Sequence, residues 1–233
     1  MNKNDFIEEL NKIGITLTES QLNKLDDFYH LLLLWNERIN LTTLTEEKDV
    51  YLKHFYDSLT LIKGIDLTKE LKVLDIGTGA GFPGIVLNIV FPNLKITLLD
   101  SLNKRINYLN EIIKELKLDN IETVCMRAED YTRINREKYD LVVSRAVANL
   151  KILTEISFAS VKKEGYFIAM KSDCEKEIEE SDLIIKNMGG YLERIIDFKL
   201  PIENSKRKLL IIKKIQLTSK KYPRKYSEIK KKK

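Results

Sequence analysis

Apolar positions in residues 1–63 recur at the spacing of helices. The segment Thr18-Glu19-Ser20-Gln21 is a capping box, in which a threonine and a glutamine three residues later satisfy backbone N–H groups at a helix start. Apolar residues then return every three or four positions as far as Ile39. A second such stretch runs from about Glu46 to Lys63. The pattern predicts two helices that each bury one face.

From Leu71 onward, short β-rich runs alternate with amphipathic stretches, of which residues 103–117 form the clearest helical pattern. This alternation predicts a Rossmann-like α/β fold, with a mostly parallel sheet covered by helices on both faces. Two later runs, residues 191–200 and 208–215, flank a turn-prone stretch and should close the sheet as an antiparallel hairpin. The predicted parallel strands are residues 72–76, 95–100, 121–126, 139–144 and 165–171.

These elements divide the chain into three expected parts. Residues 1–63 should form an N-terminal helical segment packed on the core, and residues 64–217 should form the ligand-binding domain. Residues 218–233 are poor in apolar residues and rich in lysine, which is typical of a basic C-terminal tail.

Composition narrows the class of protein. Of the 233 residues, 43% are apolar, and no apolar run approaches the roughly 18 residues that a membrane span needs. The first residues lack the pattern of a signal peptide. Two cysteines are too few for a disulfide framework, and Cys125, inside an apolar run, is expected to be a buried thiol. We therefore expect a cytoplasmic protein without a membrane partner, and a monomer.

The net charge of +5 is unevenly distributed along the chain. Residues 206–233 hold thirteen Lys or Arg and one acid, Glu228, so they carry +12 and residues 1–205 carry −7. Such a basic end can bind a polyanion, because each cation near a phosphate releases counterions. A solubilising, disordered tail explains the same run of charge, and both explanations stay open.

A glycine-rich loop, Gly77-Thr78-Gly79-Ala80-Gly81, directly follows the first predicted strand. At the carboxyl edge of such a sheet, glycines permit positive φ angles and the close approach of a ligand. Asp100 ends the second strand, where a carboxylate can accept hydrogen bonds from both hydroxyls of a ribose. Ala128 and Glu129 follow the third strand and are placed to meet an adenine edge, although Glu129 could instead be an exposed loop acid.

Asp75 distinguishes between two classes of ligand. The run Gly79-Ala80-Gly81-Phe82-Pro83-Gly84 also fits the motif of nicotinamide-dependent dehydrogenases. A carboxylate two residues before Gly77 would lie near the ligand, where it would repel a pyrophosphate and attract a cation. S-adenosylmethionine carries an ammonium group, a positively charged sulfur and no phosphate. We therefore favour a methyltransferase that uses S-adenosylmethionine over a dehydrogenase that uses NAD.

Several further segments are specific enough to indicate a family. The most specific are Phe82-Pro83-Gly84-Ile85 and Ser144-Arg145-Ala146. Others are Trp35-Asn36, Asn40-Leu41-Thr42, His54 with Asp57-Ser58, residues 97–101, Lys104-Arg105, residues 115–121 and Lys171. Through these segments the chain, over nearly its whole length, resembles the RsmG (GidB) family of bacterial 16S rRNA guanine-N7 methyltransferases. One departure is Tyr226-Ser227-Glu228, which stands where the family often has a glycine turn.

The resemblance implies a class I methyltransferase fold and a specific reaction. The methyl group of S-adenosylmethionine would pass to N7 of one guanine in a decoding-region loop of 16S rRNA, within the small ribosomal subunit or an assembly intermediate. No metal site is expected. The motif match gives seven cofactor-binding residues, which are Gly77, Phe82, Asp100, Ser101, Ala128, Glu129 and Arg145. The position of the glycine loop adds Asp75, Gly79 and Gly81 to them.

Guanine N7 has an in-plane lone pair at neutral pH, so its attack on a methyl group needs no general base. Ser144-Arg145-Ala146 also differs from the Asn/Asp-Pro-Pro-aromatic signature of amino-methylating enzymes. Catalysis should therefore come mainly from positioning, which can lower a barrier by roughly 7 to 11 kcal/mol. Arg145 is the candidate catalytic residue, either as a donor to guanine O6 or as a group that orients the cofactor.

Other side chains have more than one interpretation. His54, Asp57 and Ser58 share one stretch of helix, where they could dock the helix on the sheet or face the substrate, whereas a hydrolytic triad is a poor fit. Candidates for contact with RNA phosphates are Lys104, Arg105, Lys171, Arg224 and Lys225. A small-molecule methyltransferase and a binding module without catalysis remain alternatives, and the basic end argues against the former.

Overall fold

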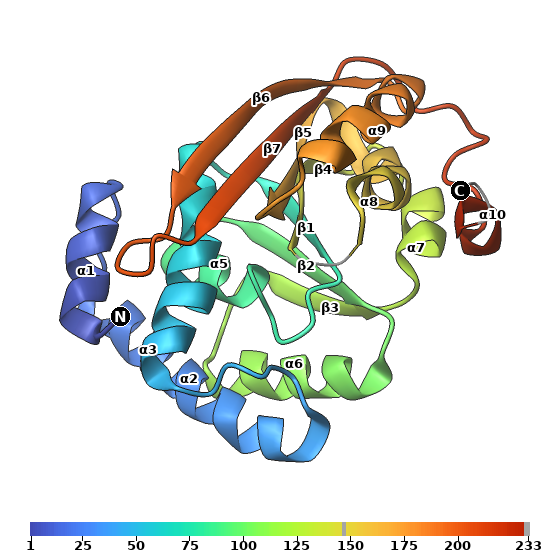
Figure 1. The fold of residues 1–233 in the computed structure, drawn as a ribbon. Helices are drawn as coiled ribbons and strands as arrows, with labels where there is room; N and C mark the ends of the chain where they lie inside the picture. Colours follow the sequence, from blue (N-terminus) through green and yellow to red (C-terminus); the bar gives the residue numbers. More distant parts are fainter. Residues whose placement is uncertain (146–147, 231–233) are drawn as a thin grey trace.

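The computed structural model describes residues 1–145 and 148–230, and within these residues a seven-stranded sheet forms the centre of the fold (Figure 1). The strands lie in the order β3-β2-β1-β4-β5-β7-β6. Strands β1 to β5 are parallel, and β7 runs antiparallel between β5 and β6. Their bounds are β1 (Lys72–Ile76), β2 (Lys95–Asp100), β3 (Ile121–Cys125), β4 (Tyr139–Arg145), β5 (Val161–Lys171), β6 (Gly190–Lys199) and β7 (Lys206–Lys214).

The predicted Rossmann-like sheet and its closing hairpin are therefore confirmed. The largest difference in bounds is at β5, which begins at Val161 rather than at residue 165. β1 pairs with both β2 and β4, so the order of the strands reverses there. Open α/β sheets bind ligands beyond the carboxyl ends of the strands at such a switch point. The glycine loop leaves β1 at this position.

Helices cover both faces of the sheet (Figure 1). Alternate residues of the central strands face two separate cores, which explains why these strands are apolar throughout. Val73 and Val143 belong to the core under α2, α5 and α6, whereas Leu74 and Val142 belong to the core under α7, α8 and α9. The bounds are α2 (Glu19–Ile39), α5 (Gly84–Val90), α6 (Asn103–Glu115), α7 (Ala128–Ile134), α8 (Leu150–Ser157) and α9 (Glu175–Asn187).

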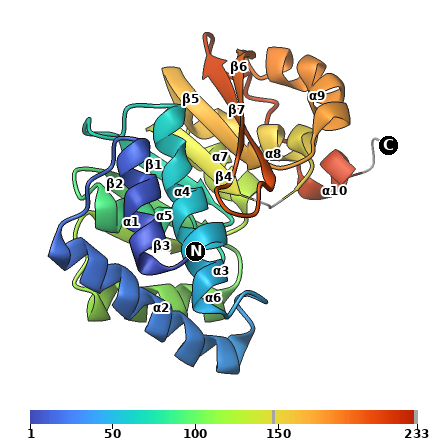
Figure 2. The same cartoon turned by 60° about the vertical axis from the view of Figure 1, so that its left-hand side comes forward.

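Residues 1–63 form an outer layer over the first core, which Figure 2 brings forward. The predicted capping box is present, since Thr18 and Gln21 exchange side-chain and backbone hydrogen bonds at the start of α2. The helix predicted over 46–63 is a continuous run of mixed winding. Its parts are α3 (Glu47–Val50), a π-helical turn (Tyr51–Tyr56), α4 (Asp57–Leu59) and a 3-10 turn (Thr60–Lys63). The chain begins with a separate helix, α1 (Lys3–Lys12).

A row of aromatic rings joins this outer layer to the glycine loop. Phe28 of α2 is fully buried and stacks on Phe55 with ring centroids 5.7 Å apart. Phe28 also contacts Phe82, at the end of the loop, at 5.4 Å, and Phe55 and Phe82 contact each other at 6.1 Å. The N-terminal segment therefore shares one hydrophobic core with the domain, and it packs against Phe82, the residue that directly follows the glycine loop.

The C-terminal residues are not a detached tail. Residues 218–230 lie along α7 and α8, and the short helix α10 (Tyr226–Lys230) ends the described chain (Figure 1). Arg136 donates hydrogen bonds to the carbonyls of Thr218 and Tyr222, and the side chain of Tyr222 is buried. For these residues the disordered tail, one of the two explanations left open for the basic end, does not apply, because backbone carbonyls and apolar side chains anchor them. Residues 231–233 lie outside the described part, as does Ala146 of the family motif.

A second correction concerns Cys125, which is exposed rather than buried. β3 is the edge strand of the sheet, and each of its residues is partly or fully exposed. The apolar run 121–126 predicted the strand correctly, but a local run does not reveal that a strand lies at an edge.

Phe28→Ala should lower the free energy of unfolding by about 3–5 kcal/mol, because it leaves a cavity between Phe55 and Phe82. Urea denaturation followed by circular dichroism measures this. Leu34→Ala, on the half-exposed side of the same helix, should change it by about 0.5 kcal/mol or less. A loss below about 1 kcal/mol for Phe28→Ala, or two separate transitions, would contradict a core shared by the N-terminal segment and the domain.

Candidate functional site

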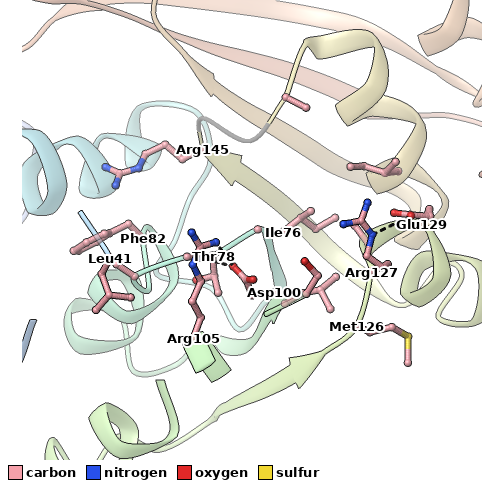
Figure 3. Close-up of a pocket in the computed structure, with 18 of the residues that line it drawn as sticks. Leu41, Ile76, Thr78, Phe82, Asp100, Arg105, Met126, Arg127, Glu129 and Arg145 are labelled. Atoms are coloured by element: carbon pink, nitrogen blue, oxygen red, sulfur yellow. Dashed lines mark hydrogen bonds and ion pairs between the residues drawn. The ribbon is translucent and has the colours of Figure 1, made fainter. Parts of the chain in front are cut away.

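A cavity of about 410 Å³ opens at the carboxyl ends of β1, β2 and β4, beside the glycine loop (Figure 3). We call it the loop cavity. Its volume is in the range of pockets that hold drug-sized ligands. Figure 3 shows Arg145, Phe82 and Leu41 on one side of it, and Arg127, Glu129 and Met126 on the other. Asp100, Arg105 and Thr78 lie between the two sides.

The glycines of the loop have two different roles. Gly77 and Gly79 line the cavity with φ angles of 68° and 58°, in the region that favours glycine. Gly81, a predicted cofactor residue, does not line the cavity. A Cβ there would lie 2.5 Å from a side-chain carbon of Ile85, so Gly81 allows the loop to pack on α5.

Asp75 also lies outside the cavity lining, which corrects the expectation that its carboxylate faces the ligand. The side chain is fully buried behind the loop, where Oδ2 accepts a hydrogen bond of 2.9 Å from the N–H of Gly84. Oδ1 has no hydrogen-bond partner among the described residues. Burial raises the pKa of Asp75 from its ordinary 3.8 to about 6.

The carboxylate of Asp75 therefore accepts a backbone N–H at the start of the helix that follows the glycine loop. In dinucleotide-binding enzymes the phosphate accepts N–H groups at the start of this helix. Here the first residue of that helix, Gly84, donates to Asp75 instead. This contact leaves the N–H of Gly84 unavailable to a phosphate, which favours a ligand without phosphate. The reason differs from the predicted one, in which Asp75 itself approaches the ligand.

Asp100 lies at the base of the cavity, almost fully buried, as the end of β2 predicted. Its Oδ2 accepts from the N–H of Gly79 at 3.1 Å and from Arg105 at 3.1 Å, and its Oδ1 accepts from the N–H of Leu102. Ser101 also lines the cavity. Arg105, predicted as an RNA contact, thus lies in the cavity with a carboxylate partner.

The far side of the cavity combines residues from β3, α7 and the C-terminal end. Ala128 and Glu129 line it as predicted, and Glu129 is buried rather than an exposed loop acid. Arg127 donates to Glu129 at 3.3 Å and stacks on the ring of Tyr226, 4.8 Å from its centroid. Tyr226, from α10, lines the same cavity.

The near side is a polar network around His54. Arg145 donates from Nη2 to Nδ1 of His54 at 3.0 Å, and His54 Nε2 lies 3.0 Å from Oγ1 of Thr42. The imidazole stacks on Phe82 with centroids 4.4 Å apart. Burial, together with the charge of Arg145, lowers the pKa of His54 to about 3, so the ring is neutral.

Asp57 extends this network to the last strand of the sheet. Its carboxylate lies 3.5 Å from Arg145 Nη1 and accepts from Arg207 of β7 at 3.2 Å. Ser58 instead donates to the carbonyl of His54 within its own helix. His54 and Asp57 thus dock the N-terminal layer on the sheet, as one of the two interpretations predicted. His54 also lines the cavity, so the two interpretations are not exclusive.

A second cavity of about 570 Å³ adjoins this network and shares His54, Arg145 and Ala148 with the loop cavity. We call it the outer cavity. It opens toward the end of β5 and is bordered by basic and acidic side chains. These are Lys53, Asp57, Lys171, Asp173, Glu177 and Arg207.

The other predicted RNA contacts differ in their surroundings. Lys104 and Lys225 are exposed. Lys171 is mostly buried and donates to Glu177 at 2.8 Å. Arg224 forms a two-pronged pair with the buried carboxylate of Glu155, at 2.7 and 2.5 Å, which anchors the C-terminal residues on α8. The structure therefore gives Lys171 and Arg224 structural partners that their charge alone did not predict.

Sequence reasoning assigned no role to Thr42, Arg127 or Tyr226, which line the loop cavity. It included Arg207 only in the basic end of the chain and did not predict its contact with Asp57. Thr42 stood within a matching family segment, which was the only signal. Trp35, from another of these segments, is half-buried against Tyr108. Among the described residues, no group of three or more His, Cys, Asp or Glu is placed to hold a metal. No helix in the same part of the chain is long and apolar enough to cross a membrane.

Comparison with known proteins gives one consistent result. The family model described as rRNA small subunit methyltransferase G matches residues 21–210. The ribosomal RNA small subunit methyltransferase G of Staphylococcus saprophyticus is 48% identical over 220 residues, which are 94% of this chain and 92% of its own. The Bacillus subtilis protein of the same name is 45% identical over 228 residues, which are 97% of this chain and 95% of its own.

Two solved structures with similar folds are named as methyltransferases. A SAM dependent methyltransferase from Aquifex aeolicus aligns with a TM-score of 0.53 and 18% identity, covering 73% of this chain and 94% of its own. The precorrin-6y C5,15-methyltransferase of Geobacter metallireducens aligns with a TM-score of 0.52 and 16% identity, covering 76% of this chain and 92% of its own. At these identities the likeness concerns the fold alone.

The pKa of Asp75 predicts a pH-dependent stability. The folded protein holds the proton of the Asp75 carboxyl more tightly than the unfolded chain does. The free energy of unfolding that this proton contributes is therefore fully present below about pH 4 and is lost as pH rises through 6. Asp75→Asn mimics the protonated acid. It should raise the free energy of unfolding by up to ~3 kcal/mol at pH 8 and by little at pH 4.

Urea denaturation of both proteins at the two pH values measures this difference. Asp182→Asn, on the exposed side of α9, should change little at either pH. A destabilisation by Asp75→Asn at pH 8 would show that the buried charge is compensated and would contradict the raised pKa.

Proposed function

The chain belongs to the rRNA small subunit methyltransferase G family, and we propose that it methylates N7 of one guanine in a decoding-region loop of 16S rRNA. The cofactor of this methyltransferase is S-adenosylmethionine. Its substrate would be the small ribosomal subunit or an assembly intermediate in the cytoplasm, and the protein would act as a monomer.

The loop cavity fits this cofactor. The N–H of Gly84 is already bonded to Asp75, which favours a ligand without phosphate, and the buried negative charge of Asp75 favours a cationic one. When bound, S-adenosylmethionine supplies a methyl group carried by a positively charged sulfur. We propose that Gly77, Thr78 and Gly79 hold its methionine end, that Asp100 and Ser101 hold the ribose, and that Ala128 and Glu129 hold the adenine.

One observation supports N7 above other acceptor atoms. His54 is the only imidazole among the described residues that line the cavity, and both of its nitrogens are engaged, with Arg145 and Thr42. With its pKa lowered to about 3, it does not remove a proton at neutral pH. The neutral, fully engaged imidazole therefore favours an acceptor with a free lone pair, such as guanine N7, over an exocyclic amine that has to lose a proton.

Arg145 then acts as a positioning residue. Its guanidinium donates to His54 and to the carbonyl of Lys53, and it lies over the ring of Phe82 at 5.1 Å. These contacts hold the near side of the cavity in one arrangement before the substrate arrives. Preorganisation of this kind is the main contribution that a protein makes when the acceptor needs no activation.

On the RNA side, we propose that the target nucleotide enters through the outer cavity. This cavity adjoins the near side of the loop cavity and carries Lys53 and Arg207 at its border. A base has to leave its stack to reach the cofactor, which favours a loop over a duplex. The exposed Lys104 and Lys225, together with the less exposed Arg105, Lys171 and Arg224, would supply positive charge to the surrounding phosphates.

The proposed reaction is tested on small ribosomal subunits that lack the N7-methylguanine. Incubation with the protein and S-adenosylmethionine should create one N7-methylguanine in 16S rRNA, detected by reduction and chain cleavage at that base. Gly79→Val should abolish the product, because the valine disfavours a φ of 58°. Methylation of an exocyclic amine, or equal activity on free guanosine, would refute the assignment.

Tyr226 tests the placement of the adenine. Tyr226→Ala removes the ring that stacks on Arg127 at the far side of the cavity, so the affinity for S-adenosylmethionine should fall by about 5- to 10-fold. Calorimetry without RNA measures this. Lys220→Ala, an exposed change in the same C-terminal stretch, should leave the affinity unchanged. An unchanged Kd for Tyr226→Ala would place the adenine elsewhere.

A further inference from the structure

The hydroxyl of Thr42 is held in an unusual hydrogen-bonding state. Its Oγ1 accepts a hydrogen bond of 3.1 Å from the N–H of Leu44. It also lies 3.0 Å from Nε2 of His54. The side chain borders the near side of the loop cavity, next to Arg145 and Phe82. The direction of the bond to His54 decides what this hydroxyl can still do.

The guanidinium of Arg145 sets that direction. A guanidinium only donates hydrogen bonds, so Nδ1 of His54, 3.0 Å from Arg145 Nη2, has to be the acceptor. Because the imidazole is neutral, its one proton is then on Nε2. Nε2 donates to Thr42, and this bond and the one from Leu44 use both acceptor sites of Oγ1. Thr42 is left with its own proton to donate.

The backbone around Thr42 is also fixed. The side chain of Asn36 accepts hydrogen bonds from the N–H groups of Leu41 and Thr42, at 2.6 and 2.9 Å. Asn40 ends α2 in the left-handed conformation and turns the chain toward the cavity. The stack of His54 on Phe82 holds the imidazole in place. The hydroxyl proton of Thr42 therefore has a defined position, and no described group accepts it.

We propose that Thr42 donates this proton to O6 of the target guanine and so selects guanine over adenine. The proposal rests on the proposed function. In guanine, O6 is an acceptor that lies beside N7 on the same edge of the base. In adenine, an amino group that donates takes its place, and it would meet a hydroxyl whose acceptor sites are both used. Guanine is selected because its O6 accepts the proton of Thr42, and adenine is rejected because its amino group finds no acceptor there.

This assignment also separates the two roles that the sequence left open for Arg145. Its guanidinium is directed to His54, to the carbonyl of Lys53 and to Asp57. It therefore acts on the base indirectly, by fixing the proton of His54, and Thr42 makes the contact with O6.

The test combines an enzyme variant with an altered base. Thr42→Val removes the hydroxyl and keeps the shape of the side chain. Reconstituted small subunits carry guanine, inosine or 2-aminopurine at the target position, and single-turnover rates are measured with each. Inosine retains O6, whereas 2-aminopurine retains N7 but lacks O6. Calorimetry with S-adenosylmethionine and a urea unfolding curve show whether the cofactor site and the fold of the variant are intact.

We expect Thr42→Val to slow the reaction by roughly 10-fold on guanine and on inosine, and to cause no further loss on 2-aminopurine. Thr42→Ser, which keeps the hydroxyl, should restore most of the rate on guanine. Affinity for S-adenosylmethionine should be unchanged in both variants.

Two results would overturn the proposal while the proposed function stands. One is an equal loss on all three bases, which would mean that Thr42 only supports His54. The other is a full rate for Thr42→Val on guanine. If the unaltered protein failed to methylate guanine in the subunit, the proposed function would fail, and the role of Thr42 with it.

Discussion

The arrangement of the site depends on the hydrogen bond from Arg145 to Nδ1 of His54. It joins the end of β4 to the N-terminal helical layer, and it settles which nitrogen of the imidazole carries the proton. Asp57 and Arg207 extend the same network to β7, so three parts of the chain that are distant in sequence meet at one side of the cavity. A site held in this way needs little rearrangement when a substrate binds.

A second buried group, Asp75, gives the loop its preference for a ligand. Its carboxylate is bonded to the start of α5, where related folds bind phosphate, and its burial raises its pKa to about 6. Burying this charge costs stability at neutral pH, and a residue that costs stability is a common feature of functional sites. The two buried groups divide the work: Asp75 shapes the cofactor side of the cavity, and Arg145 shapes the acceptor side.

Periodic apolar positions predicted the sheet, its hairpin and the capped helix α2, because strands that are covered on both faces and helices that bury one face leave regular patterns. The same patterns could not place Cys125 at an exposed edge or show that residues 218–230 pack on the body. The partner of Arg224 is Glu155, and Tyr226 contacts Arg127 on the far side of the cavity. Such contacts between distant residues have no local signature. The glycine loop and Asp100 were found because the loop follows the first predicted strand and Asp100 ends the second.

The central claim is that methyl transfer proceeds without a general base, and the pH dependence of the single-turnover rate tests it most directly. With saturating S-adenosylmethionine and small subunits, the rate should be flat between about pH 6.5 and 8.5, since the pKa of His54 lies near 3 and the acceptor lone pair is available throughout. A rate that rises about tenfold per pH unit within this range, and loses that rise in His54→Gln, would contradict the account.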